Sequence, residues 1–196
     1  GVPREMEFIL HQEVIPRLSE KYVLKTQIIK ATVLHAASMG ESVIDQKIED
    51  LERLANPTVG LLAHPGQVDI RVTAKASSES EALNLSRPIV EEVKTRLGEA
   101  IYGVDEETLE SVICQKLNRN NISLCMVETG MDPTLAERLR LGQPDQLQIK
   151  NLTETPKSES ELLDELINFK KEYSCDVMFG ITLIMNENVH VIFAYQ

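Results

Sequence analysis

The feature that most constrains this chain is an apolar run that ends in a turn. Residues 122–127 read Ile-Ser-Leu-Cys-Met-Val and are followed by Glu128, Thr129 and Gly130. A short continuous apolar run is typical of a strand buried on both faces of a parallel sheet. Many enzymes place a functional residue where such a strand enters a turn. Residues 131–135, Met-Asp-Pro-Thr-Leu, supply no small-residue loop there. The sequence thus indicates an enzyme-like frame without its usual site.

Composition and charge argue against two classes of function. The chain has 196 residues, of which 42% are hydrophobic, enough for one large domain or two small ones. No apolar stretch is long enough to cross a membrane, and no signal peptide opens the sequence. We therefore expect a cytoplasmic protein with no membrane partner. The net charge of −11 falls mostly on residues 105–196, which disfavours binding to a nucleic-acid backbone.

The cysteines and histidines match no metal-binding pattern. Cys114, Cys125 and Cys175 are widely spaced, and the four histidines form no close pair. We therefore expect no metal site. We also expect all three thiols to be reduced, because an odd number without a signal peptide is typical of the cytoplasm. Cys125, inside the apolar run, is expected to be a small buried hydrophobe.

The pattern of helices and strands divides the chain into three parts. Residues 1–19 predict a helix, with Pro3 in its first turn and Pro16 marking a kink or an end. Residues 20–104 predict strand, helix, strand, strand and helix, a small α+β unit with helices on one face of a sheet. Residues 105–196 alternate helix and strand, which is typical of a layered α/β domain. The predicted fold class is therefore α+β followed by α/β.

Within these parts the clearest local pattern is a β-hairpin. Residues 58–64 and 67–75 read as strands, and the Pro65–Gly66 pair between them is a strong turn signal. The second strand alternates apolar and polar side chains, as expected when one face is buried. The other expected elements are strands at 22–34, 122–128, 146–152, 175–185 and 188–195, and helices at 41–54, 77–97, 105–119, 131–141 and 160–173.

Several segments together resemble the competence/damage-inducible CinA family. Gly-Val-Pro-Arg-Glu-Met at 1–6 is similar to a loop near the end of that family's N-terminal molybdopterin-binding-like domain. Residues 56–76 resemble its middle, KH-like domain, and residues 101–113 resemble the linker and first helix of its C-terminal domain. The resemblance implies that the three parts are, in order, a terminal helix of a first domain, a KH-like domain and a degenerate nicotinamide-nucleotide amidohydrolase-like domain.

The resemblance also supplies candidate site residues. In the family, the strand equivalent to 122–128 leads into Ala-Glu-Ser-Cys-Thr-Gly-Gly, whose Ser is the proposed nucleophile. Thr129 falls where that Ser is expected, or pairs with the later Thr, and is the candidate catalytic residue. A Gly-Val-Pro loop that opens a helix can present N–H groups to phosphate; the alternative is that it only starts the helix. The candidate ligand-binding residues are Gly1, Val2, Pro3, Glu5, Glu128 and Gly130.

Three departures from the family pattern argue against amide hydrolysis. Met131 and Asp132 replace small residues. The glycine-rich loop expected after Gly180-Ile181-Thr182 is missing, and the family's Tyr-Ser-Asn-x-x-Lys segment leaves only Lys150 as a match. Together these losses remove the polar lining that amide hydrolysis needs, including any oxyanion hole. A threonine nucleophile also needs an adjacent base, and no His or Lys lies near Thr129 in the sequence.

The KH-like resemblance raises the question of RNA binding, which the residues disfavour. KH domains clamp the RNA backbone with a Gly-x-x-Gly loop, and none occurs in residues 20–104. The nearest match, Gly40-Glu41-Ser42-Val43, lacks the second glycine and precedes an acidic helix that would repel phosphate. We therefore expect no nucleic-acid partner.

These observations favour a non-catalytic role. We expect a scaffold or oligomerisation module that forms homo-oligomers and carries no cofactor, with any hydrolysis of ADP-ribose-type nucleotides in an N-terminal domain that precedes residue 1. One alternative is a nicotinamide-nucleotide amidohydrolase with Thr129 as nucleophile. The other is a sensor that binds a nucleotide-type small molecule without turnover.

Overall fold

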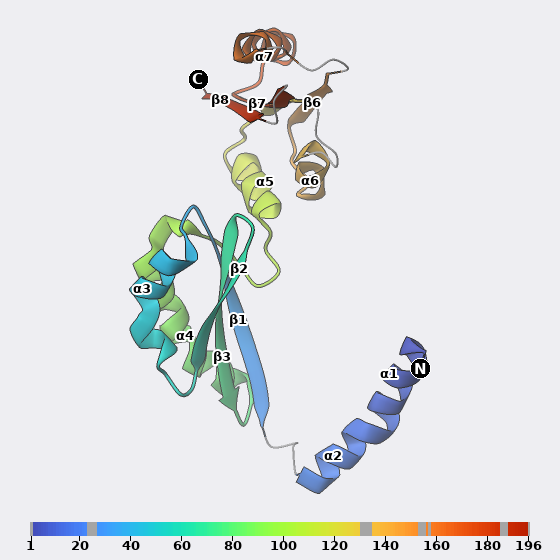
Figure 1. Cartoon of the computed structure of the whole chain (residues 1–196), viewed down its shortest axis with the longest axis vertical. Coiled ribbons are helices and arrows are strands. Elements are labelled where there is room, and N and C mark those ends of the chain that lie inside the picture. The colour runs from blue at the N-terminus through green and yellow to red at the C-terminus, as the bar shows by residue number, and fades with distance from the viewer. Residues whose placement is uncertain are drawn as a thin grey trace. The chain divides into compact units, whose positions relative to one another are not determined.

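The computed structural model divides the chain into two compact units, Gly1–Glu106 and Glu107–Gln196 (Figure 1). None of the described helices is long and apolar enough to cross a membrane. The residues that the structure describes are 2–22, 27–129, 135–152, 156, 158–184 and 188–195.

The first unit begins with a helix that passes through Pro16. α1 (Pro3–Ile9) leads into a π-helical turn, η1 (Leu10–Val14), and then into α2 (Ile15–Tyr22). The irregularity expected near Pro16 is this wide turn, which lies just before the proline, whose ring otherwise clashes with a carbonyl of the preceding turn. The helix therefore continues to Tyr22 instead of ending near residue 19.

The spacing of the apolar side chains offers a second reason for the wide turn. Large apolar residues recur here every four positions, whereas an α-helix has 3.6 residues per turn, so the series would drift around a regular helix. A π-helical turn holds more residues and offsets part of that drift. None of these side chains is buried. The series is Met6, Leu10, Val14, Leu18 and Tyr22.

The rest of the first unit is a four-stranded antiparallel sheet in the order β2-β3-β1-β4, with both helices on one side of it (Figure 1). The predicted hairpin is confirmed, with His64 paired to Gln67 across a turn that contains Gly66 at φ 81°, a conformation that glycine adopts readily. The strands are β1 (Ile28–Ala37), β2 (Thr58–His64), β3 (Gln67–Ala76) and β4 (Ile101–Val104), and the helices are α3 (Glu41–Glu52) and α4 (Glu79–Leu97).

Two predictions for this sheet are wrong. The first strand begins at Ile28 and not at residue 22, because the N-terminal helix occupies residues up to Tyr22. β4 was expected to be part of a linker, but it pairs antiparallel with β1, with Leu34 opposite Val104. A four-residue strand is too short to show a reliable period, so its partner strand decides its conformation.

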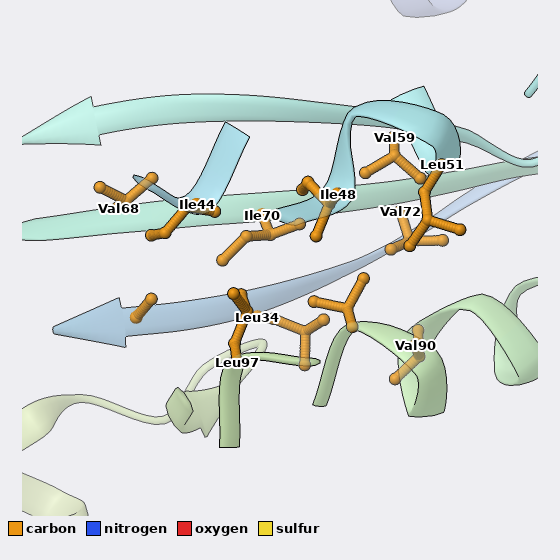
Figure 2. Packing of buried hydrophobic residues seen from close by; sticks show 12 residues of the cluster. Leu34, Ile44, Ile48, Leu51, Val59, Val68, Ile70, Val72, Val90 and Leu97 are labelled. Atoms are coloured by element: carbon orange, nitrogen blue, oxygen red, sulfur yellow. The ribbon is translucent and has the colours of Figure 1, made fainter. Parts of the chain in front are cut away.

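The core of the first unit is aliphatic and lies between the sheet and the two helices (Figure 2). β3 shows the predicted alternation, with the apolar residues Val68, Ile70, Val72 and Ala74 buried. One face of the sheet is therefore packed, and the other carries the intervening polar side chains. Residues that join the core from other elements are Leu34, Ile44, Ile48, Leu51, Val59, Val90, Val93 and Leu97.

The second unit is a layered α/β domain with helices on both faces of its sheet (Figure 1). The order is β6-β5-β7-β8, with β5 parallel to both neighbours and β7 antiparallel to β8. The fold class is thus α+β followed by α/β, as predicted. The strands are β5 (Leu124–Thr129), β6 (Leu147–Asn151), β7 (Val177–Ile184) and β8 (Asn188–Tyr195), and the helices are α5 (Leu109–Arg119), α6 (Leu135–Leu141) and α7 (Glu159–Tyr173).

As predicted, the apolar run leads into an inner strand, β5, although that strand begins at Leu124 and not at residue 122. All six residues of β5 are buried. Cys125 and Val127 belong to one apolar cluster with α7, while Leu124 and Met126 belong to another with α5 and α6. A strand covered on both faces needs apolar side chains at consecutive positions, which explains why the sequence shows no alternation here.

Cys125 and Cys175 form a disulfide, which corrects the expectation of three reduced thiols. Their Cα atoms are 5.7 Å apart, although the residues are 50 positions apart in the sequence. Cys175 lies just before β7, the strand beside β5, so strand pairing brings the two side chains together. Cys114 on α5 is a free, buried cysteine.

Candidate functional site

Glu128 at the end of β5 caps a helix. Its side chain is almost fully buried, and its carboxylate accepts hydrogen bonds from the backbone N–H groups of Leu135 at 2.7 Å and Ala136 at 3.1 Å. These groups open α6, and the first N–H groups of a helix have no partner within it. The helix dipole also favours a carboxylate at this end. The charge of Glu128 is therefore used inside the fold.

Thr129 is held by a second structural contact. Only 8% of the residue is exposed, and its hydroxyl donates to the backbone carbonyl of Leu152 at 3.3 Å. This bond ties the end of β5 to the residue that follows β6. A nucleophilic hydroxyl needs a base within hydrogen-bond reach. Among the residues that the structure describes, Thr129 makes no hydrogen bond to a histidine, a lysine or a carboxylate.

Strand pairing places two further polar residues level with Thr129. Thr129 is opposite Thr182 of β7, and Thr182 is opposite His190 of β8. Because neighbouring strands are about 4.8 Å apart, the backbone of His190 lies roughly 10 Å from that of Thr129. The row is at the carboxyl ends of the parallel strands, where ligands bind in open α/β sheets. Sequence reasoning missed His190 because only the sheet register relates it to Thr129.

The N-terminal candidates lie at the start of α1. Val2 is the N-cap residue, Pro3 occupies the first turn and Glu5 follows, all of them exposed. The N–H groups of Glu5 and Met6 donate to the carbonyl of Val2 at 3.0 and 3.2 Å, so both are already used by the helix. Gly1 and Gly130, together with the first four residues of the helix predicted at 131–141, lie outside the described residues.

Lys150, the remaining match to the family's lysine segment, is paired within the second unit. It lies on β6, and its Nζ is 2.7 Å from Oε2 of Glu165 on α7. The same ammonium group lies 6.0 Å from the ring centre of Phe169. Both contacts connect the edge strand to α7, a structural role for this lysine.

A cluster that sequence reasoning missed lies on the sheet face of the first unit opposite α3 and α4. Leu34 and Ala36 of β1 point into the core, so His35 between them lies on the other face. Nδ1 of His35 is 2.7 Å from Oδ1 of Asp69, and its Nε2 is 2.7 Å from the carbonyl oxygen of Asp105. The alternation of apolar and polar residues in β3 could have placed Asp69 on this face. The register between β1 and β3, which sets Asp69 opposite His35, could not be read from the sequence.

Two more aromatic or basic groups complete this cluster. Nε2 of His64 is 3.1 Å from the second carboxylate oxygen of Asp69. The ring of Tyr102 stacks on His35 with centroids 5.8 Å apart, and its hydroxyl donates to Oε1 of Gln67 at 2.8 Å. Burial, the largest single effect, lowers the pKa of His35, but the bonds to Asp105 and Asp69 together raise the pKa above its ordinary value.

No group of three or more His, Cys, Asp and Glu side chains suited to a metal ion occurs among the described residues. In the cluster just described, both ring nitrogens of His35 already face protein oxygen atoms. The hydrogen bonds of this cluster therefore depend on how many protons the His35 ring carries.

The comparisons with known proteins identify the family. Residues 31–103 match the Damage-inducible protein CinA KH domain. The chain is 38% identical over 139 residues to a putative competence-damage inducible protein of Moorella thermoacetica, covering 71% of this chain and 33% of that protein. It is 39% identical over 140 residues to the protein of that description from Clostridium botulinum (strain Okra / Type B1), covering 71% and 34%. The chain belongs to the CinA family.

The matched range corresponds to the first sheet. Residues 31–103 run from β1 into β4, so the CinA KH unit comprises the four strands and the two helices that cover them. A CinA-like protein of Prochlorococcus marinus is 35% identical over 129 residues, covering 66% of this chain and 30% of that protein. The chain therefore spans about one third of the length of the curated relatives it matches.

A solved structure adds no argument about function. A formyltetrahydrofolate deformylase from Pseudomonas putida covers 78% of this CinA chain, with 59% of its own length matched, at 11% identity and a TM-score of 0.23. That score is too low to assign a fold.

Proposed function

We propose that this CinA chain is a non-catalytic scaffold that self-associates. In the proposal, any hydrolysis of ADP-ribose-type nucleotides belongs to a domain outside this chain. The observation that carries it is the use of Glu128 and Thr129 within the fold. The carboxylate of Glu128 caps α6, and the hydroxyl of Thr129 donates to the Leu152 carbonyl.

These two contacts favour a structural role because both groups are nearly buried. A polar group taken out of water needs a hydrogen-bond partner, and removing that partner leaves the group unpaired. The carboxylate of Glu128 already accepts two backbone N–H bonds, so its oxygen atoms are engaged within the fold. Attack by Thr129 would likewise require its hydroxyl to leave the Leu152 carbonyl.

An assay of ammonia release tests the absence of catalysis. The 196-residue chain is incubated with nicotinamide mononucleotide, beside Thr129→Ala and the matched variant Thr129→Ser, which keeps a hydroxyl. We expect no release above the level of Thr129→Ala. Release that Thr129→Ala abolishes and Thr129→Ser retains would overturn the proposal in favour of a deamidase.

The register of the second sheet supports the deamidase as a second candidate. Thr129, Thr182 and His190 occupy one row at the carboxyl ends of β5 and β7. A histidine is the commonest general base, and a threonine needs one to act as a nucleophile. If ammonia is released, His190→Gln tests this arrangement: a loss as large as that of Thr129→Ala supports it, and unchanged release contradicts it.

A ligand-binding role without turnover is the remaining form of the proposal. Titration calorimetry with ADP-ribose and with nicotinamide mononucleotide tests it on the same chain. Heat that saturates at one ligand per chain, with no ammonia released, would support a sensor of nucleotide-type small molecules. If neither compound gives a binding heat, the sensor is rejected and only the scaffold role remains.

Self-association is supported by the apolar side chains of the N-terminal helix. An isolated helix of this length is marginal in water, so an apolar stripe on it needs a partner surface. Nine large side chains are exposed along this helix, and a stable interface buries roughly 800 Å² per partner. A second copy offers the same stripe, and a two-fold axis pairs the two. The side chains are Val2, Met6, Phe8, Ile9, Leu10, Val14, Ile15, Leu18 and Tyr22.

Light scattering across a concentration series tests this surface. We expect the chain to be a dimer or larger and the double variant Leu10→Gln, Leu18→Gln to be a monomer with unchanged circular dichroism. The matched control Glu20→Gln lies on the same helix and should leave the assembly intact. A chain that is monomeric at every concentration would contradict self-association.

A further inference from the structure

Both ring nitrogens of His35 face oxygen acceptors at short distance. Nδ1 lies 2.7 Å from Oδ1 of Asp69, and Nε2 lies 2.7 Å from the carbonyl oxygen of Asp105. Neither oxygen can donate a proton at neutral pH, since one belongs to a carboxylate and the other to the backbone. A neutral imidazole has only one N–H, so it can satisfy one acceptor while its other nitrogen faces an oxygen lone pair. Only the doubly protonated ring donates to both.

The groups around the ring stabilise that cation. Asp69 on β3 supplies a carboxylate whose second oxygen is 3.1 Å from Nε2 of His64 on β2. Tyr102 on β4 stacks on the ring, with an angle of 22° between the planes. Asp105, beyond β4, supplies a carbonyl and a second negative charge. His64 contacts the same carboxylate, and the exposed Arg71 lies two positions from Asp69 on the same face of β3, while Asp69 and Asp105 supply the negative charges that raise the pKa of His35.

The contact to Asp105 holds the exit from the CinA KH sheet. The N–H of Asp105 donates to the carbonyl of Val33 at 2.8 Å, and the N–H of Val33 donates to Oδ1 of Asp105 at 2.9 Å. These bonds extend the pairing with β1 one residue beyond β4. Asp105 has a φ of 55°, in the left-handed region that aspartate adopts more readily than most non-glycine residues, and its two hydrogen bonds with Val33 fix it there. His35 supplies the contact to its carbonyl.

We infer that His35 is a pH-sensitive latch of the KH unit. While both ring nitrogens carry a proton, the ring bridges Asp69 and the Asp105 carbonyl and holds residues 104–106 against β1. Loss of one proton to solvent breaks one of the two bonds, and Asp69, the charged acceptor, retains the remaining N–H. The Asp105 carbonyl is then released, and the segment that leaves the sheet loosens as the pH rises.

Two measurements on the 196-residue chain test the latch. Nitrogen-detected NMR gives the protonation of each histidine ring across the pH range. Amide hydrogen exchange, corrected for the intrinsic effect of pH, gives the protection of Val33 and Asp105. We expect His35 to titrate above its ordinary value of 6.5 and the protection of Asp105 to be lost over that same pH interval.

Three variants separate the latch from a general effect of pH. Asp69→Asn keeps an oxygen acceptor but removes the charge, so the loss of protection should move to lower pH. His35→Gln should leave protection low and independent of pH. His64→Gln is the matched control, because His64 contacts Asp69 and has no described contact with Asp105; the pH dependence should persist.

Two outcomes would overturn the His35 latch. A His35 ring that loses its proton at or below pH 6.5 would contradict it, as would Asp105 protection that ignores the titration of His35. If His35→Gln fails to fold, Asp69→Asn still decides, since unchanged pH dependence in that variant would also contradict the latch.

Discussion

In the CinA KH unit two helices cover one face of the sheet, whereas in the second unit helices cover both faces (Figure 1). The one-sided sheet leaves a face on which His35, Asp69 and Tyr102 meet. The two-sided sheet leaves no such face, so its polar residues Glu128 and Thr129 are buried against backbone groups. Polar residues at the end of a buried strand can thus serve the fold, because burial itself requires them to find partners.

The largest expected effects test how many faces each central strand buries. On β3, Ile70→Ala should cost roughly 2–5 kcal/mol of unfolding free energy, while its exposed neighbour Arg71→Ala should change it by less than about 0.5 kcal/mol. On β5, the neighbours Met126 and Val127 are both buried, so both alanine variants should cost roughly 2 kcal/mol or more. Native-state hydrogen exchange resolves each unit. If either Met126→Ala or Val127→Ala left the unfolding free energy unchanged, β5 would not be buried on both faces.

A smaller effect tests how closely α7 packs on the second sheet. A Cβ added at Gly180 would clash with Cδ1 of Leu166 and lie 3.3 Å from Cγ of Leu162. Gly180→Ala should therefore destabilise the second unit by about 1–3 kcal/mol. The control is Gly60→Ala on the edge strand β2, where no heavy atom lies within 4 Å of the added Cβ. That variant should be neutral or slightly stabilising. Equal effects on thermal unfolding would show that α7 does not constrain Gly180.

The smallest effect is an opposite dependence on pH in the two units. The pKa of His35 is raised in the fold, so its contribution is complete below pH 6.5 and is lost as the pH rises through the folded pKa. The pKa of Asp176 is lowered, first by the backbone N–H of Ser123 at 2.8 Å and then by its hydroxyl. That contribution is present above the unfolded value near 3.8 and is lost as the pH falls through the folded pKa.

The contribution of His35 to the CinA KH unit should therefore be lost on the alkaline side, and the contribution of Asp176 to the second unit on the acid side. Denaturant unfolding followed by hydrogen exchange between about pH 3 and pH 9 measures both trends. His35→Gln should reduce the pH dependence of stability in the CinA KH unit, and Ser123→Ala should reduce it in the second unit. If His35→Gln leaves the alkaline loss unchanged, or Ser123→Ala leaves the acid loss unchanged, that group does not govern the pH dependence of its unit.

Sequence reasoning succeeded where structure depends on neighbouring residues. The hairpin around Pro65 and Gly66 and the buried strand from Leu124 follow from turn chemistry and from hydrophobic period. It failed at β4, which is too short for a period, and it left open whether the helix bends or ends near Pro16, where a π-helical turn lets the helix continue. At the candidate site, Thr129 and Glu128 were found through the family resemblance, while their partners Leu152, Leu135 and Ala136 were not.

The sequence by itself determined most of the helices and strands, that a one-sided sheet is followed by a two-sided one, and that the chain resembles the CinA family. Those properties are local, because period, turn residues and motifs are read within a few positions. Only the tertiary structure decided which polar groups meet. His35 reaches the Asp105 carbonyl across 70 positions, and Cys125 reaches Cys175 across 50. Strand order and register set such contacts, and both depend on the packing of the whole unit.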